Sequence, residues 1–118
     1  MKGVVLFGHG SRDPAWKLPM EKVATRVAKS SPDTRVVCAY LELDQPDLGS
    51  AVAGLVNGGA VEIAILPMFL GVGRHAREDL PRLVDAARQA HPRVSFRVLP
   101  AIGEDDEVLD LIARRALV

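Results

Sequence analysis

Residues 3–12 read GVVLFGHGSR, and the first six of them decide the fold. Residues 3–8 are apolar at successive rather than alternate positions, so both faces of the segment have to be covered. Such a run is typical of a parallel strand that lies between helices on either side of a sheet. Three further apolar runs extend the pattern along the chain, at residues 34–41, 61–67 and 94–99. The sequence therefore predicts four strands of a parallel sheet.

Longer amphipathic segments separate and follow these strands. They predict helices over residues 19–30, 47–57, 78–90 and 105–117. Pro19 and Pro81 suit the first turns of two of these helices, and Gly58 suits the end of another. Because strands alternate with helices, we expect one doubly wound α/β domain over residues 1–118, with a four-stranded parallel sheet flanked by helices.

Composition excludes several classes of protein. The chain has 118 residues, 15 Lys and Arg against 15 Asp and Glu, and one cysteine, Cys38. Zero formal net charge and 4% aromatic residues argue against a nucleic-acid partner, which needs basic and stacking side chains. A single cysteine excludes an internal disulfide and a cysteine-based zinc site. No apolar run approaches the roughly 18 residues that span a membrane, and we expect a cytoplasmic protein without membrane contact.

Two histidines and an isolated acidic residue follow the predicted strands. His9 comes after the first strand, Glu42 after the second, and His75 in a glycine-containing loop after the third. Ligands of open α/β sheets bind at the carboxyl ends of the strands, so these three residues are expected on one rim. Neutral imidazole is a common ligand of divalent first-row metals, and a carboxylate can complete the site or accept protons. The sequence therefore predicts a metal site with His9 and His75 as ligands.

Each of these residues also has a simpler explanation. His9 could cap the following helix or fill the rim, and Glu42 could be an ordinary loop carboxylate. A solvated position in a loop would explain His75 equally well. The third histidine, His91, precedes Pro92 at the predicted end of a helix, where a cation near the last carbonyl groups is the expected role.

Three arginines flank the histidines, Arg12, Arg74 and Arg77, and their guanidinium groups suit carboxylates on a ligand. A nucleotide is not expected. Asp13 stands where a dinucleotide-binding fingerprint has its third glycine, and no phosphate-binding lysine motif occurs. Ser11 lacks the flanking glycines that mark a catalytic serine at a sharp strand-to-helix turn.

Taken together, these segments resemble the small, single-domain sirohydrochlorin chelatases of the CbiX type, in the class II chelatase superfamily. The matching pieces are residues 8–12 (GHGSR), Leu41-Glu42 followed by Pro46, and residues 67–75 (PMFLGVGRH) continuing through Asp79-Leu80-Pro81. The resemblance covers essentially the whole chain, in order and in length.

The resemblance implies ATP-independent insertion of a divalent metal into sirohydrochlorin, toward cobalamin, sirohaem or a nickel tetrapyrrole. Co²⁺ is the expected metal substrate, with Fe²⁺ and Ni²⁺ as alternatives, and no nucleotide takes part. His9 and His75 correspond to the family's metal-binding histidines, and Glu42 to their acidic partner. The positions implied to contact the anionic tetrapyrrole are Ser11, Arg12, Phe69, Leu70, Gly71, Val72, Gly73, Arg74 and Arg77.

The resemblance also implies a homodimer. Longer class II chelatases resemble two such domains facing each other, so a chain of 118 residues corresponds to one half of a cleft that encloses the tetrapyrrole. One segment departs from the family. Residues 103–106 are Gly-Glu-Asp-Asp, where members often have Gly-x-His-Pro. The departure leaves His9 and His75 untouched.

Two other functions remain open at this point. A histidine at the end of the first strand also resembles the phosphorylated histidine of some sugar-phosphotransferase components, which would make the chain a phosphoryl carrier. Such a carrier needs neither His75 nor Glu42. A non-catalytic protein that binds metal or tetrapyrrole would use the same residues as a chelatase, so the sequence does not separate these two.

Overall fold

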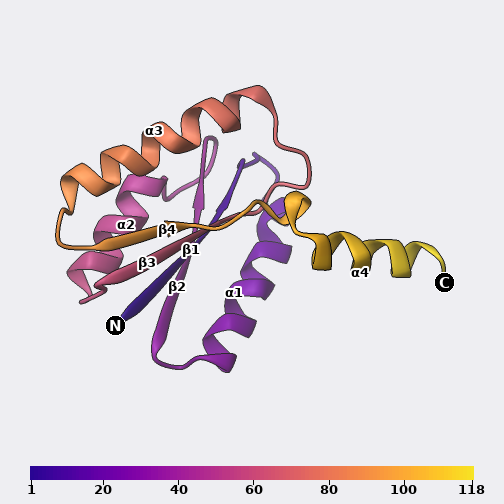
Figure 1. The fold of residues 1–118 in the computed structure, drawn as a ribbon, viewed down its shortest axis with the longest axis horizontal. Coiled ribbons are helices and arrows are strands. Elements are labelled where there is room, and N and C mark those ends of the chain that lie inside the picture. The colour runs from indigo at the N-terminus through magenta and orange to yellow at the C-terminus, as the bar shows by residue number, and fades with distance from the viewer.

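Four parallel strands form the centre of the computed structural model, which describes residues 1–118. The strands are β1 (Lys2–Gly8), β2 (Thr34–Tyr40), β3 (Glu62–Pro67) and β4 (Ser95–Val98). The helices are α1 (Leu18–Ser30), α2 (Leu48–Asn57), α3 (Arg74–Ala90) and α4 (Asp106–Ala116), with short 3₁₀ turns η1 (Pro14–Lys17) and η2 (Ile102–Glu104). Strand order is β2-β1-β3-β4, and all neighbours pair in parallel. The predicted α/β class and four-stranded sheet are confirmed (Figure 1).

Strand β1 is buried on both faces, as its continuous apolar run predicts. Val5 and Phe7 belong to the larger apolar cluster, which α2 and α3 cover. Leu6 points to the opposite face and packs with Met20 of α1 and Tyr40 of β2. Figure 1 shows α2 and α3 on one side of the sheet and α1 on the other. Each such side chain contributes about 1.5–3 kcal/mol through its burial, so β1 anchors both layers of helices.

Helix α3 differs from its prediction at its start. It begins at Arg74 rather than at Glu78, so Pro81 lies inside the helix and not in its first turn. Gly73 has extended backbone angles (φ −69°, ψ 165°) and ends the preceding loop, which allows the helix to start directly after it. The proline removes one main-chain donor. Burial of side chains such as Val84 against the sheet offsets that loss.

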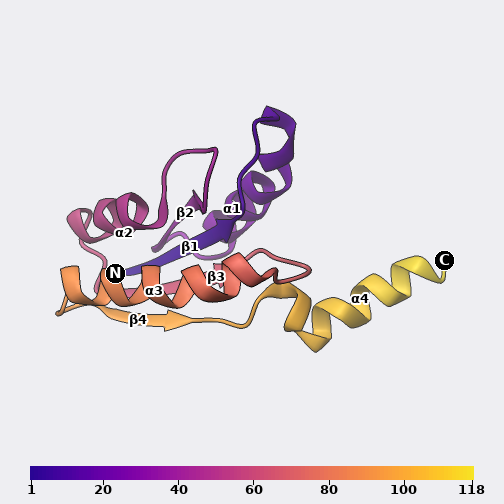
Figure 2. The same ribbon diagram turned by 90° about the horizontal axis from the view of Figure 1, so that it is seen from above.

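Helix α4 forms where the amphipathic pattern predicts it but does not cover the sheet. The Asp105 carboxylate caps it by accepting hydrogen bonds from the main-chain N–H groups of Glu107 (2.9 Å) and Val108 (3.4 Å). No residue of α4 is buried. Figures 1 and 2 show the helix extending away from the other elements, with the C-terminus at its far end. None of the helices has the length and apolar character needed to cross a membrane.

Asp47 caps α2, and this cap yields a prediction. Its carboxylate accepts a hydrogen bond from the Ser50 main-chain N–H at 2.8 Å. Hydrogen bonding to Ser50, first to its main chain and then to its side chain, holds the pKa of Asp47 below its ordinary value of 3.8. Because folding favours the charged form, this stabilisation is complete above the ordinary pKa and is lost as the pH falls through the lowered value.

We expect Asp47→Ala to lower the free energy of unfolding by about 1 kcal/mol at neutral pH. The difference from the unsubstituted protein should disappear once the pH is below the lowered pKa of Asp47. Urea unfolding of both proteins across that range measures it. A penalty of the same size in strong acid would show that the cap does not act through the carboxylate charge.

Candidate metal-binding rim

The carboxyl ends of the strands meet at one edge of the sheet, here called the rim. It consists of residues 9–13, 41–47, 68–75 and 99–105, which follow β1, β2, β3 and β4 respectively. Main-chain hydrogen bonds join these segments beyond the strands. The Glu42 N–H donates to the His9 carbonyl at 3.0 Å, and the Gly103 N–H donates to the Phe69 carbonyl at 3.0 Å. The rim is therefore a continuation of the sheet and not a set of independent loops.

Gly10 allows a close approach of two main-chain segments within the rim. Its φ of 98° lies in the left-handed region that side chains rarely adopt. A Cβ built on Gly10 would overlap the main-chain carbonyl oxygen of Glu42. The glycine after His9 therefore lets the segment after β1 lie directly against the segment after β2.

His9 is half-buried, and its ring packs against the aromatic ring of Phe69. The ring centroids of His9 and Phe69 lie 4.4 Å apart, and Phe69 in turn contacts Phe7 edge-on at 5.9 Å. Phe69 is only 2% exposed. Phe69 and Leu70 were both predicted to contact a ligand. Phe69 is buried and packs against His9, whereas Leu70 is 62% exposed and offers apolar surface to a ligand. The imidazole of His9 makes no hydrogen bond and no ion pair within the chain.

His75 lies on a helix rather than in a loop, which corrects the sequence interpretation. It is the second residue of α3, because the helix begins at Arg74. Its side chain is exposed. Since α3 starts directly beyond the segment after β3, His75 stands at the rim at the N-terminal end of the helix, where the first main-chain N–H groups have no partner within the helix.

Strand order decides how near the three predicted residues lie. His9 follows the central strand β1, and Glu42 and His75 follow its two neighbours, β2 and β3. Two strand spacings, about 10 Å, separate the ends of β2 and β3. No group of three or more His, Cys, Asp or Glu side chains is arranged to hold a metal ion within the chain. At the rim, the main chains of Glu42 and His9 are therefore joined by a hydrogen bond. The side chains of His9, Glu42 and His75 do not form a complete three-ligand site.

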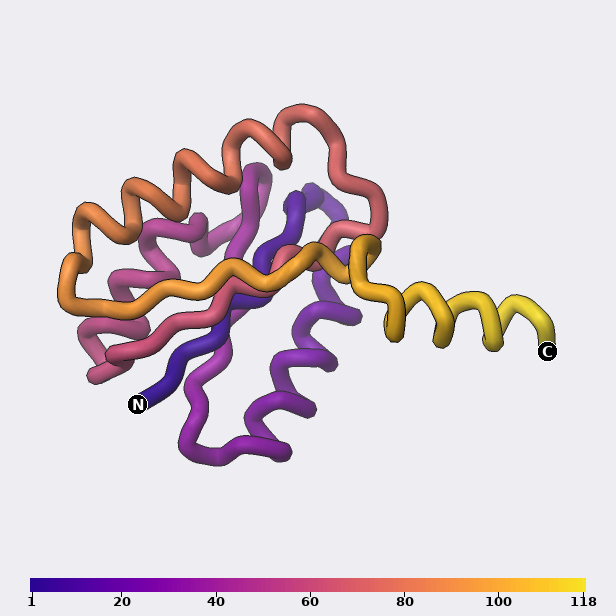
Figure 3. Tube along the Cα trace, viewed as in Figure 1, coloured from indigo at the N-terminus to yellow at the C-terminus, as the bar shows by residue number.

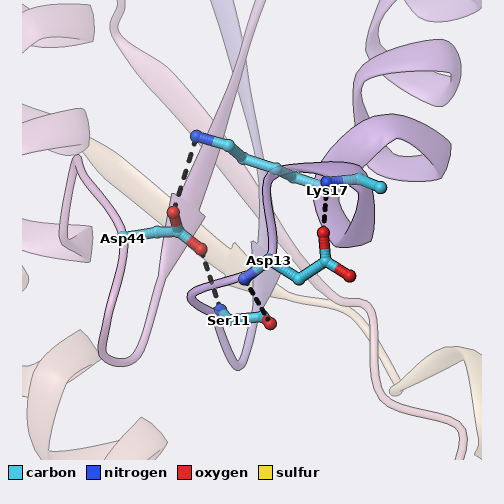
Figure 4. A network of polar contacts seen from close by, with 5 residues as sticks. Ser11, Asp13, Lys17 and Asp44 are labelled. Atoms are coloured by element: carbon cyan, nitrogen blue, oxygen red, sulfur yellow. Dashed lines mark hydrogen bonds and ion pairs between the residues drawn. The ribbon is translucent and has the colours of Figure 1, made fainter.

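Asp44 is the residue that the sequence analysis missed (Figure 4). Its carboxylate accepts a hydrogen bond from the Ser11 main-chain N–H at 2.8 Å and pairs with Lys17 at 3.5 Å. Ser11 in turn accepts at its Oγ a hydrogen bond from the Asp13 N–H at 3.1 Å. Asp44 therefore fixes the segment that carries His9 to the loop that carries Glu42.

Replacing Asp44 by alanine removes the only acceptor for the Ser11 N–H. Because this is a half-buried hydrogen bond to a charged group, we expect Asp44→Ala to lower the free energy of unfolding by about 1.5–3 kcal/mol. Lys17→Ala breaks only the partly exposed ion pair and should cost less than about 1 kcal/mol. Urea unfolding of the two variants checks this order, and equal losses would contradict the role given to the Ser11 hydrogen bond.

The three predicted arginines have different surroundings. Arg74 is paired with Glu78 through a contact of 3.1 Å along the surface of α3, whereas Arg12 and Arg77 form no ion pair. Arg77 also borders a cavity of about 210 Å³ beside the rim. The cavity is lined mostly by apolar side chains, among them Val72, Leu80, Val98 and Leu99. The unpaired guanidinium group of Arg77 next to this apolar surface suits a flat ligand that carries carboxylates.

Cys38 and Tyr40 lie on the α1 face of the sheet and outside the rim. Burial is the main cause that raises the pKa of the Cys38 thiol, so the sulfur stays protonated and is a poor nucleophile. Burial, followed by the neighbouring Cys38, Glu21 and Asp44, raises the pKa of Tyr40 to about 12. Cys38 packs against the smaller apolar cluster and is therefore a packing residue.

Comparison with known proteins adds three likenesses. The family model CbiX matches residues 3–117. A sirohydrochlorin cobaltochelatase of Methanosarcina barkeri is 29% identical over 120 residues, which cover 96% of this chain and 92% of the relative. A crystal structure from Marinobacter aquaeolei, described as a CbiX protein of cobalamin (vitamin B12) biosynthesis, superposes with a TM-score of 0.81 at 30% identity and covers 99% of this chain and 94% of the other.

A longer protein shows the same fold. The sirohydrochlorin chelatase SirB of Bacillus subtilis, solved in complex with cobalt, has a TM-score of 0.76 to this chain and is 25% identical. The match covers 98% of this chain but 49% of SirB. One copy of the present fold thus accounts for about half of that protein.

Proposed function

The chain belongs to the CbiX family, and we propose that it is a metal chelatase that inserts a divalent metal ion into sirohydrochlorin without ATP. Co²⁺ is the metal favoured by the names of the relatives, because both the Methanosarcina barkeri enzyme and the SirB complex are described with cobalt. Fe²⁺ and Ni²⁺ are the alternative substrates. The observation that carries the proposal is the family match over residues 3–117, with His9 and His75 both at the rim.

The rim suits transient rather than permanent metal binding. We propose that His9 and His75 each give one imidazole nitrogen to the ion, while water fills the other positions. Two neutral nitrogen ligands hold the ion more weakly than a closed site of four ligands, so the ion can pass to the pyrrole nitrogens of the substrate. The ring of His9 packs against that of Phe69, with the centroids 4.4 Å apart, and this contact restricts the movement of the imidazole.

Insertion also requires bases. One dication enters the macrocycle and two pyrrole N–H protons leave, so charge balances when both protons pass to acceptors on the protein or in water. Glu42 supplies a carboxylate whose main chain is bonded to that of His9. We propose that Glu42 takes up such protons, a role in which a positioned carboxylate is common.

The substrate is a flat ring with carboxylate side chains. Arg12 and Arg77, which form no ion pair within the chain, are proposed to bind those carboxylates. Arg74 is paired with Glu78, so it contributes less to binding the carboxylates of the substrate. Leu70 and Val72 supply apolar surface to the face of the ring, with Ser11, Gly71 and Gly73 completing the surrounding loops.

We further propose a homodimer in which two rims enclose one tetrapyrrole. The coverage of SirB supports this arrangement, because one chain accounts for 49% of that protein and two copies equal its length. A cytoplasmic location and a single domain over residues 1–118 stay predictions.

The proposed activity is tested by mixing sirohydrochlorin with Co²⁺, Fe²⁺ or Ni²⁺ and following the absorbance of the macrocycle without ATP. We expect the initial rate to rise in proportion to the protein concentration above a protein-free blank, for at least one of the three metals. A rate equal to that of the blank with all three metals would contradict the proposal.

A further inference from the structure

The ring of His9 has no hydrogen-bonding partner within the chain to orient it. A histidine that binds a metal usually donates its second ring N–H to a carboxylate, a carbonyl group or water, and this bond fixes the direction of the ring. His9 is half-buried and packs against Phe69 with a centroid distance of 4.4 Å. Apart from that contact, the position of the His9 ring depends on how the main chain of residues 9–12 is held.

The loop after β2 holds this main chain on both sides of Gly10, and Figure 3 shows the two segments side by side. Before the glycine, the Glu42 N–H donates to the His9 carbonyl at 3.0 Å. After it, the Ser11 N–H donates to the Asp44 carboxylate at 2.8 Å. Gly10 has a φ of 98° and no side chain, so the segment bends more easily there than at other residues. The contact with Asp44 therefore limits bending of the segment at Gly10.

The backbone and the burial of the loop both favour this contact. Leu43, with a φ of 66°, is the only non-glycine residue in the left-handed region, where side chains cause strain. It turns the chain directly before Asp44. The side chain of Asp44 is 11% exposed, against 30% to 67% for the acidic side chains of the other three ion pairs. A charge buried to this extent needs partners, and the Ser11 N–H and Lys17 supply them.

We propose that Asp44 is a positioning residue for His9. Through the Ser11 N–H it fixes the main chain after Gly10, and it thereby holds the His9 imidazole where this ring binds Co²⁺. The inference rests on the proposed function, and it adds to the metal site a residue that touches neither the ion nor the tetrapyrrole. Loss of the Asp44 acceptor weakens metal binding although both imidazole ligands remain.

Calorimetric titration with Co²⁺ alone tests this role. We expect Asp44→Ala to raise the dissociation constant for Co²⁺ about tenfold, because loss of a group that orients a metal ligand typically weakens binding by this order. Asp44→Asn should restore the constant to within about threefold of the unsubstituted value, since its amide oxygen still accepts from the Ser11 N–H. Lys17→Ala breaks the ion pair but leaves that acceptor in place, so it should bind Co²⁺ as Asp44→Asn does.

Val84→Ala separates positioning from a general loss of stability. Val84 is 2% exposed in the second half of α3 and belongs to the larger apolar cluster. Its truncation destabilises the fold through lost packing, but it removes no contact of the rim. We expect this variant to melt at a lower temperature and to bind Co²⁺ with unchanged affinity. Far-ultraviolet circular dichroism at the temperature of the titration checks that every variant is folded.

The visible absorption of bound Co²⁺ distinguishes positioning from direct ligation. Asp44→Ala keeps both imidazoles, so its spectrum at saturating Co²⁺ should match that of the unsubstituted protein. His9→Ala should change the spectrum, because water then replaces one nitrogen ligand and the absorption of the ion depends on its ligands. A changed spectrum in Asp44→Ala would show that Asp44 itself binds the ion, which contradicts the proposal.

Three results of the titration would overturn the proposal. An unchanged affinity in Asp44→Ala would show that His9 does not depend on Asp44. If Asp44→Asn or Lys17→Ala binds as weakly as Asp44→Ala, the charge and not the hydrogen bond to Ser11 is responsible. An equal loss in Val84→Ala would reduce the effect to stability.

The titration contains no sirohydrochlorin, so its result is separate from that of the insertion assay. A protein whose Co²⁺ affinity depends on Asp44 but which does not metallate sirohydrochlorin would refute the chelatase and leave the role of Asp44 standing. Equal metallation and equal Co²⁺ affinity with and without the Asp44 acceptor would do the reverse. If the unsubstituted protein binds no Co²⁺, the metal site and the role of Asp44 are both wrong.

Discussion

Replacing His9 and His75 together by alanine is expected to reduce metal insertion to the rate of the protein-free reaction, a loss of about 100-fold or more. Both proposed nitrogen ligands are then gone, and Glu42 alone cannot hold a divalent first-row ion against water. Calorimetric titration with Co²⁺ should show the same loss of binding. The fold should remain, because His75 is exposed on the first turn of α3 and His9 is only half-buried.

His91→Ala is the matched control for the histidine variant. His91 follows the last residue of α3 and lies at the opposite end of the helix from His75. We expect this variant to bind Co²⁺ and to insert it as the unsubstituted protein does. If the His9→Ala, His75→Ala protein still metallates sirohydrochlorin at an undiminished rate, the metal site proposed at the rim is wrong.

Gly10→Ala is expected to cause a large loss of stability at the rim. The backbone at Gly10 has a φ of 98°, and the new Cβ would overlap the Glu42 carbonyl oxygen. Strain at this angle costs about 1–3 kcal/mol, and separating two hydrogen-bonded main-chain segments adds to it. We expect the free energy of unfolding to fall by at least about 3 kcal/mol, which lowers the melting temperature by roughly 12 °C.

Gly54→Ala provides the contrast, because it places the same methyl group in open space. Nothing lies within 4 Å of a Cβ at Gly54, which sits inside α2. Replacing a glycine in a helix interior by alanine should raise the free energy of unfolding by about 0.5–1 kcal/mol. Thermal unfolding of the two variants side by side checks the opposite signs. A Gly10→Ala protein as stable as the unsubstituted chain would contradict the close packing of the two rim segments.

The fold could be predicted because its determinants are local. The continuous apolar run of β1 requires cover on both faces, and the structure provides it at Val5 and Leu6. The start of α3 could not be placed, because Pro81 is a good first-turn residue and nothing before it excludes a longer helix. The sequence also could not predict that α4 packs against no other element of the chain. An amphipathic pattern shows that one face of a helix needs a partner, but it does not show where that partner lies.

The candidate site was predicted in part for the same reason. His9 directly follows β1, and His75 lies at the start of α3, after the segment that follows β3. Chain topology alone therefore assigns both to the rim. Asp44 was missed because its partner Ser11 lies 33 residues away, and an aspartate in a loop has the same local surroundings whether or not it has a distant donor. The buried position of Phe69 under His9 likewise depends on contacts between the ends of β1 and β3.

Counting turnovers tests most directly whether the chain is a chelatase rather than a carrier of metal or tetrapyrrole. Sirohydrochlorin is supplied in large excess over the protein, with Co²⁺ also in excess and no ATP, and the metallated product is measured until the absorbance stops changing. A chelatase predicts conversion of nearly all the sirohydrochlorin, with many product molecules per chain. Product that stops at one molecule or fewer per chain would contradict the account and would identify a stoichiometric binding protein.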